Sequence, residues 1–143
     1  MKVKELMTEN LAYATIGTSL PDVAKMMMDY DCGCLPVIED ERSKKPIGVI
    51  TDRDITIRTV AHHKDPLNMV AGEVMTDQII TVTPDMTIDE CLSKMEGNQI
   101  RRIVVVNDAG VLCGMVAQAD IARHAAATKT AELVKDVSMT AGS

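Results

Sequence analysis

The sequence contains almost no aromatic residues: none of its 143 residues is Phe or Trp, and Tyr13 and Tyr30 are the only tyrosines. The 11 methionines supply flexible apolar bulk of the kind that fills irregular gaps in a core. Because Met26, Met27 and Met28 fall within a helical pattern, we interpret them as core filling. A methionine-lined groove for a partner is the alternative.

Basic clusters and long apolar runs are also missing. No more than two Lys or Arg residues are adjacent and the net charge is -6, so we do not expect a nucleic-acid-binding surface. No window approaches the ~18 apolar residues of a membrane span, and the N-terminus lacks a basic flank followed by an apolar stretch. We therefore expect a cytoplasmic protein without a nucleic-acid or membrane partner.

The residues that could carry metal or catalytic chemistry are few. Cys32, Cys34, Cys91 and Cys113 lie in segments that we interpret as buried helix or strand, where a reducing compartment keeps them as thiols. A metal site made by Cys32 and Cys34 with His62, His63 and His124 is the alternative. C-x-C alone is a weak signal and the histidines do not follow the Cys/His spacing of zinc fingers, so we predict no metal site. No nucleophile-elbow or Walker motif occurs, and we predict that the protein is not an enzyme.

One motif is written twice along the chain, which decides the architecture. Seven residues of the first copy, Glu5, Met7, Thr8, Thr15, Met27, Val37 and Asp40, recur 68 residues later as Glu73, Met75, Thr76, Thr83, Met95, Val105 and Asp108. Further on, Gly48, Asp54 and Ile55 match Gly114, Asp120 and Ile121, so the first copy has two extra residues around 41–46. An insertion of this kind is tolerated at a polar turn.

Each copy predicts the element order β-α-β-β-α after a short helical turn. We expect strands at 11–14, 35–38 and 47–51 and at 79–82, 103–106 and 111–117. Capping boxes at Ser19 and Asp22, and at Thr87 and Glu90, mark the first helix of each copy. The second helix is expected at 53–60 and at 119–127.

The predicted fold is therefore α+β, with two repeats packed face to face as one pseudo-symmetric module, because one copy of about 60 residues is marginal alone. We assign residues 1–60 to repeat 1, 61–70 to a linker and 71–127 to repeat 2. Asp65-Pro66, within the linker, prevents the preceding helix from continuing. The tail, 128–143, is expected to hold a short amphipathic helix that docks onto the body or a second chain.

This double pattern, with Met7-Thr8 and Met75-Thr76 opening the copies and the run from Gly48 to Asp54 closing the first sheet, resembles the CBS domain pair, or Bateman module. The resemblance covers residues 3–127. It is strongest to small stand-alone bacterial pairs, including the mycobacterial hypoxic response type.

The resemblance implies a regulatory module that binds an adenine nucleotide (AMP, ADP or ATP, with or without Mg) or a related adenosyl ligand between the repeats. It also implies a head-to-head homodimer that signals energy state or stress to a client protein, with no cofactor of its own. The alternative is a ligand-free structural or stress-associated dimer.

The resemblance implies two clefts. The better one, which we call the first cleft, combines the end of the first sheet with residues of the second repeat. At the turn from strand to helix, the hydroxyl of Thr51 and the free amides of the helix suit a phosphate, and Asp54 can accept both ribose hydroxyls. Alternatively, Asp54 caps the helix or pairs with Arg53. By resemblance, the nucleotide-binding residues of this cleft are Thr51, Arg53, Asp54, Thr76, Ile79, Thr81, Ile100, Arg101 and Arg102. The two adjacent arginines suit phosphates or an exposed surface equally.

The second implied cleft is weaker, because Ala117 stands at the position of Thr51 and has no hydroxyl. By resemblance it combines Thr8, Leu11, Tyr13, Cys32, Cys34 and Asp120. Tyr13 could stack on an adenine or fill its pocket.

Overall fold

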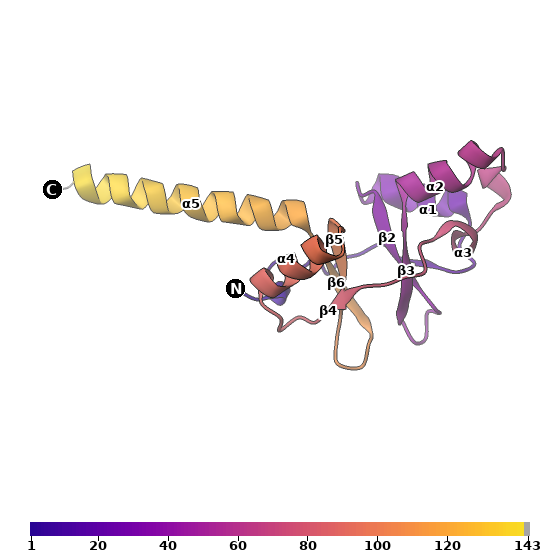
Figure 1. Cartoon of the computed structure of the whole chain (residues 1–143), viewed down its shortest axis with the longest axis horizontal. Coiled ribbons are helices and arrows are strands. Elements are labelled where there is room, and N and C mark those ends of the chain that lie inside the picture. The colour runs from indigo at the N-terminus through magenta and orange to yellow at the C-terminus, as the bar shows by residue number, and fades with distance from the viewer. Residues whose placement is uncertain (142–143) are drawn as a thin grey trace.

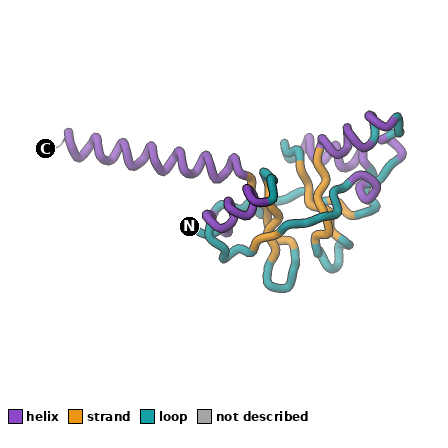
Figure 2. Tube along the Cα trace, viewed as in Figure 1, coloured by secondary structure: helices purple, strands orange, loops and turns teal. Residues whose placement is uncertain are grey.

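The computed structural model describes the backbone of residues 1–141 and the side chains of residues 1–134; Gly142 and Ser143 lie outside the described residues. It has two three-stranded sheets accompanied by helices, which confirms the predicted α+β fold. Figures 1 and 2 show the strands of both sheets in the middle of the body, with helices towards its two ends.

The two halves of the chain repeat the same elements. The first contains η1 (Val3–Glu5), β1 (Ala14–Thr15), α1 (Leu20–Asp29), β2 (Cys34–Ile38), β3 (Pro46–Thr51) and α2 (Asp52–Arg58). Two 3-10 turns, η2 (Val60–His62) and η3 (Pro66–Asn68), follow. The second contains α3 (Ala71–Val74), β4 (Thr81–Val82), α4 (Ile88–Gly97), β5 (Arg102–Val106), β6 (Leu112–Ala117) and α5 (Gln118–Ala141). The edge strands β1 and β4 are two residues long, shorter than predicted.

Both sheets have the same topology and even the same irregularity. In each, the first strand pairs parallel with the second, which pairs antiparallel with the third. The register shifts between Val37 and Ile38 in one sheet and between Val105 and Val106 in the other. The sequence repeat is therefore a structural repeat down to the position of its bulge.

The starts of α1 and α4 lie where the sequence places them. Ser19 Oγ accepts a hydrogen bond from the amide of Asp22, and Thr87 Oγ1 accepts one from the amide of Glu90, both at 3.2 Å. In these two described helices, the second hydrogen bond of a capping box, from the amide of Ser19 or Thr87 to the acidic side chain, is absent. The acidic side chains are exposed there, where water competes for the carboxylate, so each cap satisfies one amide rather than two.

Each opening helical turn packs into the core of the other repeat. Val3 of η1 is buried with the second-half residues Val82 and Cys91, whereas Ala71 and Val74 of α3 are buried in the first-half core. A third apolar cluster joins the two halves; it consists of Cys34, Val104 and Met115, with Leu11, Val49 and Ile79 packed against it. The repeats thus share their cores, which explains why one copy does not bury enough surface alone.

Two backbone bridges close this exchange. Thr8 and Met115 exchange hydrogen bonds of 2.9 and 3.1 Å, and Thr76 and Val49 exchange bonds of 2.8 and 3.0 Å. A Cβ atom on Gly48 would collide with the carbonyl oxygen of Thr76, and one on Gly114 would lie 2.8 Å from Met7 Sδ. Gly48 is required because a Cβ there would meet backbone of the crossing segment, whereas at Gly114 the flexible Met7 side chain would have to move.

The C-terminal helix corrects one prediction. A helix at 119–127 followed by a separate short helix in the tail is wrong, because α5 continues unbroken from Gln118 to Ala141. Alanines fill 125–127 and neither Gly nor Pro interrupts the helix. Residues 128–134 are exposed and Figure 1 shows α5 leading away from the body, so the expected docking of the tail onto the body is limited to its start, where Thr128, Lys129 and Glu132 line a pocket with residues of the body. Among the described helices, none is both long and apolar enough to cross a bilayer.

The bridge at Gly48 gives a direct stability prediction. Gly48→Ala should lower the free energy of unfolding by about 1–3 kcal/mol, because the methyl group must displace the Thr76 backbone or distort β3. Urea denaturation measures this. The control is Gly97→Ala, since a Cβ there meets nothing within 4 Å and alanine is the better helix former. Equal stability of Gly48→Ala and wild type would contradict the account of the bridge.

Candidate functional site

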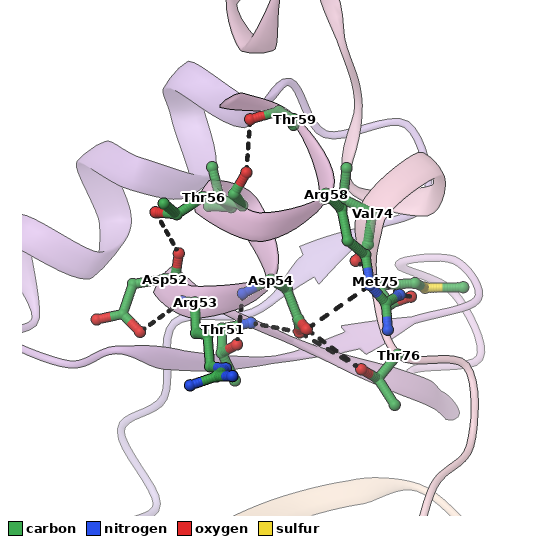
Figure 3. A network of polar contacts seen from close by, with 11 residues as sticks. Thr51, Asp52, Arg53, Asp54, Thr56, Arg58, Thr59, Val74, Met75 and Thr76 are labelled. Carbon is green, nitrogen blue, oxygen red and sulfur yellow. Dashed lines mark hydrogen bonds and ion pairs between the residues drawn. The ribbon is translucent and has the colours of Figure 1, made fainter. Parts of the chain in front are cut away.

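The junction of β3 and α2 is a complete capping box. Thr51 Oγ1 accepts a hydrogen bond from the amide of Asp54 at 3.0 Å, and Asp54 Oδ2 accepts one from the amide of Thr51 at 3.1 Å. The hydroxyl of Thr76 also lies within 3.4 and 3.5 Å of the two Asp54 carboxylate oxygens (Figure 3). The structure therefore brings Thr51, Asp54 and Thr76 together across the repeats, and the carboxylate already has a capping role.

Arg58 completes this network, and sequence reasoning missed it. Its Nη1 donates to the carbonyl oxygens of Val74 and Met75 at 3.1 and 2.7 Å, and its Nε lies 4.0 Å from Asp54 Oδ1 (Figure 3). The spacing of four residues from Asp54 was the available signal. Arg53, the partner considered from sequence, is exposed instead at the start of α2.

The other predicted members of the first cleft are distributed over several places. Ile79 packs in the apolar cluster between the repeats, and Ile100 packs against the second core. The Thr81 carbonyl oxygen accepts a hydrogen bond from Lys94 Nζ at 2.6 Å, and that of Arg101 accepts one from the Gln118 amide at 2.8 Å.

A cavity of about 260 Å³ lies at the corresponding place in the other half, where β6 meets α5. Both repeats contribute to its wall, which consists of Thr8, Asn10, Leu11, Ala12, Tyr30, Asp31, Cys32, Cys34, Arg102, Met115, Ala117 and Asp120. Five of the six residues expected in the second cleft thus line one cavity. Arg102, expected in the first cleft, lies here as well.

The acidic residue of this cavity is less engaged than its counterpart Asp54. Ala117 cannot supply a capping hydroxyl, and among the described side chains the Asp120 carboxylate pairs with Arg123 alone. The Arg123 side chain is 76% exposed, whereas that of Asp120 is 28% exposed. A ligand hydroxyl therefore competes at Asp120 only with a solvated ion pair, which contributes little free energy.

Tyr13, the sixth residue, turns towards the hairpin between β2 and β3. Its hydroxyl donates to Glu41 Oε2 at 2.8 Å, and the Lys44 ammonium lies 5.6 Å from its ring centroid. The hydrogen bond to Glu41 raises the pKa of Tyr13. Both partners of Tyr13 thus lie in the hairpin that contains the two extra residues of the first copy.

The thiols of the cavity differ in burial. Cys34 is 7% exposed, and burial raises its pKa to about 11 although the charge of Arg102 lowers it. Cys32 is partly exposed. Within the described residues, no three His, Cys, Asp or Glu side chains are grouped closely enough to hold a metal ion.

Comparison with known proteins agrees with this architecture. The model of the CBS domain family matches residues 3–58 and 71–127. Hypoxic response protein 1 of Mycobacterium tuberculosis is 37% identical over 119 residues, which cover 83% of this chain and 81% of that protein. An uncharacterized Bacillus subtilis protein, YlbB, is 35% identical over 84% of this chain and 79% of its own length.

Solved structures also share the fold. The crystal structure of Hypoxic Response Protein I with two coordinated zinc ions has a TM-score of 0.76 and 32% identity, covering 87% of this chain and 98% of that one. The CBS domain pair of MJ0100, in complex with 5′-methylthioadenosine and S-adenosyl-L-methionine, has a TM-score of 0.76 and 29% identity, covering 86% and 98%. The chain therefore belongs to the CBS domain family. It carries two CBS domains and is similar to the hypoxic response type.

The two strand-to-helix junctions give a paired prediction. Thr51→Ala should lower the free energy of unfolding by about 1 kcal/mol by removing the cap, and Ala117→Thr should raise it by about 0.5–1 kcal/mol by adding the missing one. Thermal and urea unfolding measure both. Ala117→Val is the control, because valine has the shape of threonine without its hydroxyl. A gain from valine equal to that from threonine would contradict a capping effect.

Proposed function

We propose that this protein is a regulatory module that binds an adenosine-containing ligand in the cavity between its CBS repeats. The observation that carries the proposal is the Asp120 carboxylate in a cavity walled by both repeats. A carboxylate can accept both hydroxyls of a ribose. The related MJ0100 pair, which binds 5′-methylthioadenosine and S-adenosyl-L-methionine, supports the same ligand class here.

The remaining walls suit the rest of such a ligand. Leu11, Ala12 and Met115 offer apolar surface to a purine, and Thr8 and Asn10 offer hydrogen-bonding groups at its edge. The guanidinium of Arg102 provides a cation for a phosphate or a carboxylate. This arrangement supports AMP, ADP, ATP or a related adenosyl compound, with or without magnesium.

The first cleft is proposed as a secondary position, which reverses the order expected from sequence. A ribose at Asp54 would compete with the Thr76 hydroxyl, the Thr51 amide and the nearby Arg58. Among the described side chains, Asp120 has only its pair with Arg123 to exchange. The energetic cost of admitting a ligand is therefore lower at Asp120.

Binding across the repeats provides a means of signalling. A ligand held by segments 8–12 and 30–34 of the first repeat and by Arg102 and Asp120 of the second stabilises one relative arrangement of the two repeats. Its effect on that relation is limited by its difference in affinity for the alternative states. We propose a client protein as the recipient, in the cytoplasm, with energy state or stress as the signal and without catalysis.

A head-to-head homodimer is part of the proposal. Large apolar side chains are exposed on and beside α1 and α2: Met28 is 72% exposed, Val60 61%, Tyr30 47% and Ile57 40%. Large apolar side chains left exposed on neighbouring segments of a small protein favour association. The same observation supports the second candidate function, a ligand-free structural dimer that only associates.

Ligand-dependent thermal unfolding separates the two candidates. We expect AMP, ADP, ATP, 5′-methylthioadenosine or S-adenosylmethionine to raise the Tm, since a ligand at about 100 times its Kd adds about 2.7 kcal/mol to the free energy of unfolding. Each nucleotide is tested with magnesium and with a chelator.

The matched variants are Asp120→Asn and Asp54→Asn, each compared with its own ligand-free Tm. Loss of the shift in Asp120→Asn alone supports the cavity. Loss in Asp54→Asn alone would move the ligand to the first cleft. No shift with any compound in ligand-free protein would contradict ligand sensing and favour the structural dimer.

A further inference from the structure

Two of the four cysteines face the cavity proposed for the ligand. Cys32 and Cys34 are separated by one glycine, and both line the wall formed by residues 30–34. At the equivalent positions of the second repeat stand Ile100 and Arg102, so only one of the two clefts can carry thiols there. The other two cysteines are placed differently: Cys91 is fully buried in the second core, and Cys113 lies on β6 with its thiol 3.4 Å from the Val105 carbonyl oxygen.

The two cavity thiols are unequal as nucleophiles. Cys34 is 7% exposed, and burial raises its pKa from 9.0 to about 11. The thiolate is the reacting form, so the raised pKa leaves Cys34 almost wholly protonated at neutral pH. Cys32 is partly exposed at the turn that follows α1 and is open to a reagent that enters the cavity. Attack therefore begins at Cys32.

We propose that Cys32 is a thiol-modification site, at which a low-molecular-weight disulfide forms an adduct that fills the cavity and excludes the adenosine-containing ligand. The inference rests on the proposed function and adds a means of regulating it. The chemistry is thiol–disulfide exchange. The Cys32 thiolate attacks one sulfur of the disulfide, a new sulfur–sulfur bond forms to Cys32, and the other half leaves as a thiolate that takes up the proton Cys32 lost.

The neighbouring thiol determines how long the adduct persists. Release by Cys34 would require its thiolate to attack the new disulfide and form a bond to Cys32. The burial that keeps Cys34 protonated makes this second step slow. The mixed disulfide is thus the product that accumulates, and an external thiol removes it.

Oxidised glutathione is the probe, with intact-mass spectrometry and peptide mapping as the first readout. Wild type and Cys34→Ser should gain one glutathionyl group at Cys32, whereas Cys32→Ser should gain none there. Cys113→Ser is the matched control, because Cys113 is also partly exposed but lies outside the cavity wall. Its loss should leave the rate of the Cys32 adduct unchanged.

The second readout is the ligand-induced Tm shift, measured before and after modification and again after reduction. The proposal predicts that the ligand-induced Tm shift is lost in the adduct and returns on reduction. It also predicts that ligand slows the modification of Cys32 without affecting that of Cys113. An unchanged shift in the adduct, or modification of Cys113 as fast as that of Cys32, would overturn it while leaving the proposed function intact. If unmodified protein shows no shift, the proposed function and the exclusion of its ligand both fail.

Discussion

The structure depends on the exchange of opening segments between the two repeats. Val3 completes the second core and Val74 completes the first, so neither repeat buries its own apolar surface without the other. The backbone bridges at Thr8 and Thr76 hold the exchanged segments against the third strand of the opposite sheet. A cleft between the repeats is consequently built from both of them. A ligand that binds there affects how the two repeats are arranged relative to each other.

The backbones of the two repeats are nearly symmetric, so the two clefts differ mainly through their side chains. Thr51 caps α2 and engages Asp54, whereas Ala117 leaves Asp120 without a capping partner. Where the first repeat has Cys34, the second has Arg102 at the equivalent position, and both line the cavity. The same fold thus holds one junction closed by its own hydrogen bonds and one that opens into a cavity, and this difference is the reason for proposing the cavity as the ligand site.

Features encoded locally or by repetition could be predicted from the sequence, and long-range side-chain contacts could not. The repeat spacing located both sheets, and the helix caps at Ser19 and Thr87 followed from local polar spacing. The length of α5 was misjudged, because the apolar residues of the tail were interpreted as a separate short helix although neither Gly nor Pro interrupts 118–141. The partners of Tyr13 and the absence of a cap at Asp120 depend on tertiary placement, so resemblance could indicate the cavity residues but could not rank the two clefts.

The central claim is that the adenosine-containing ligand lies in the cavity at Asp120. Amide chemical-shift mapping during titration with adenosine 5′-monophosphate and with 5′-methylthioadenosine tests it most directly. We expect the largest changes at residues 10–12, 32–34 and 118–120, from both repeats at once, for whichever ligand binds. Changes confined to residues 51–54 and 76–81 would place the ligand at the first cleft, and no change at saturating concentrations of either compound would contradict the account.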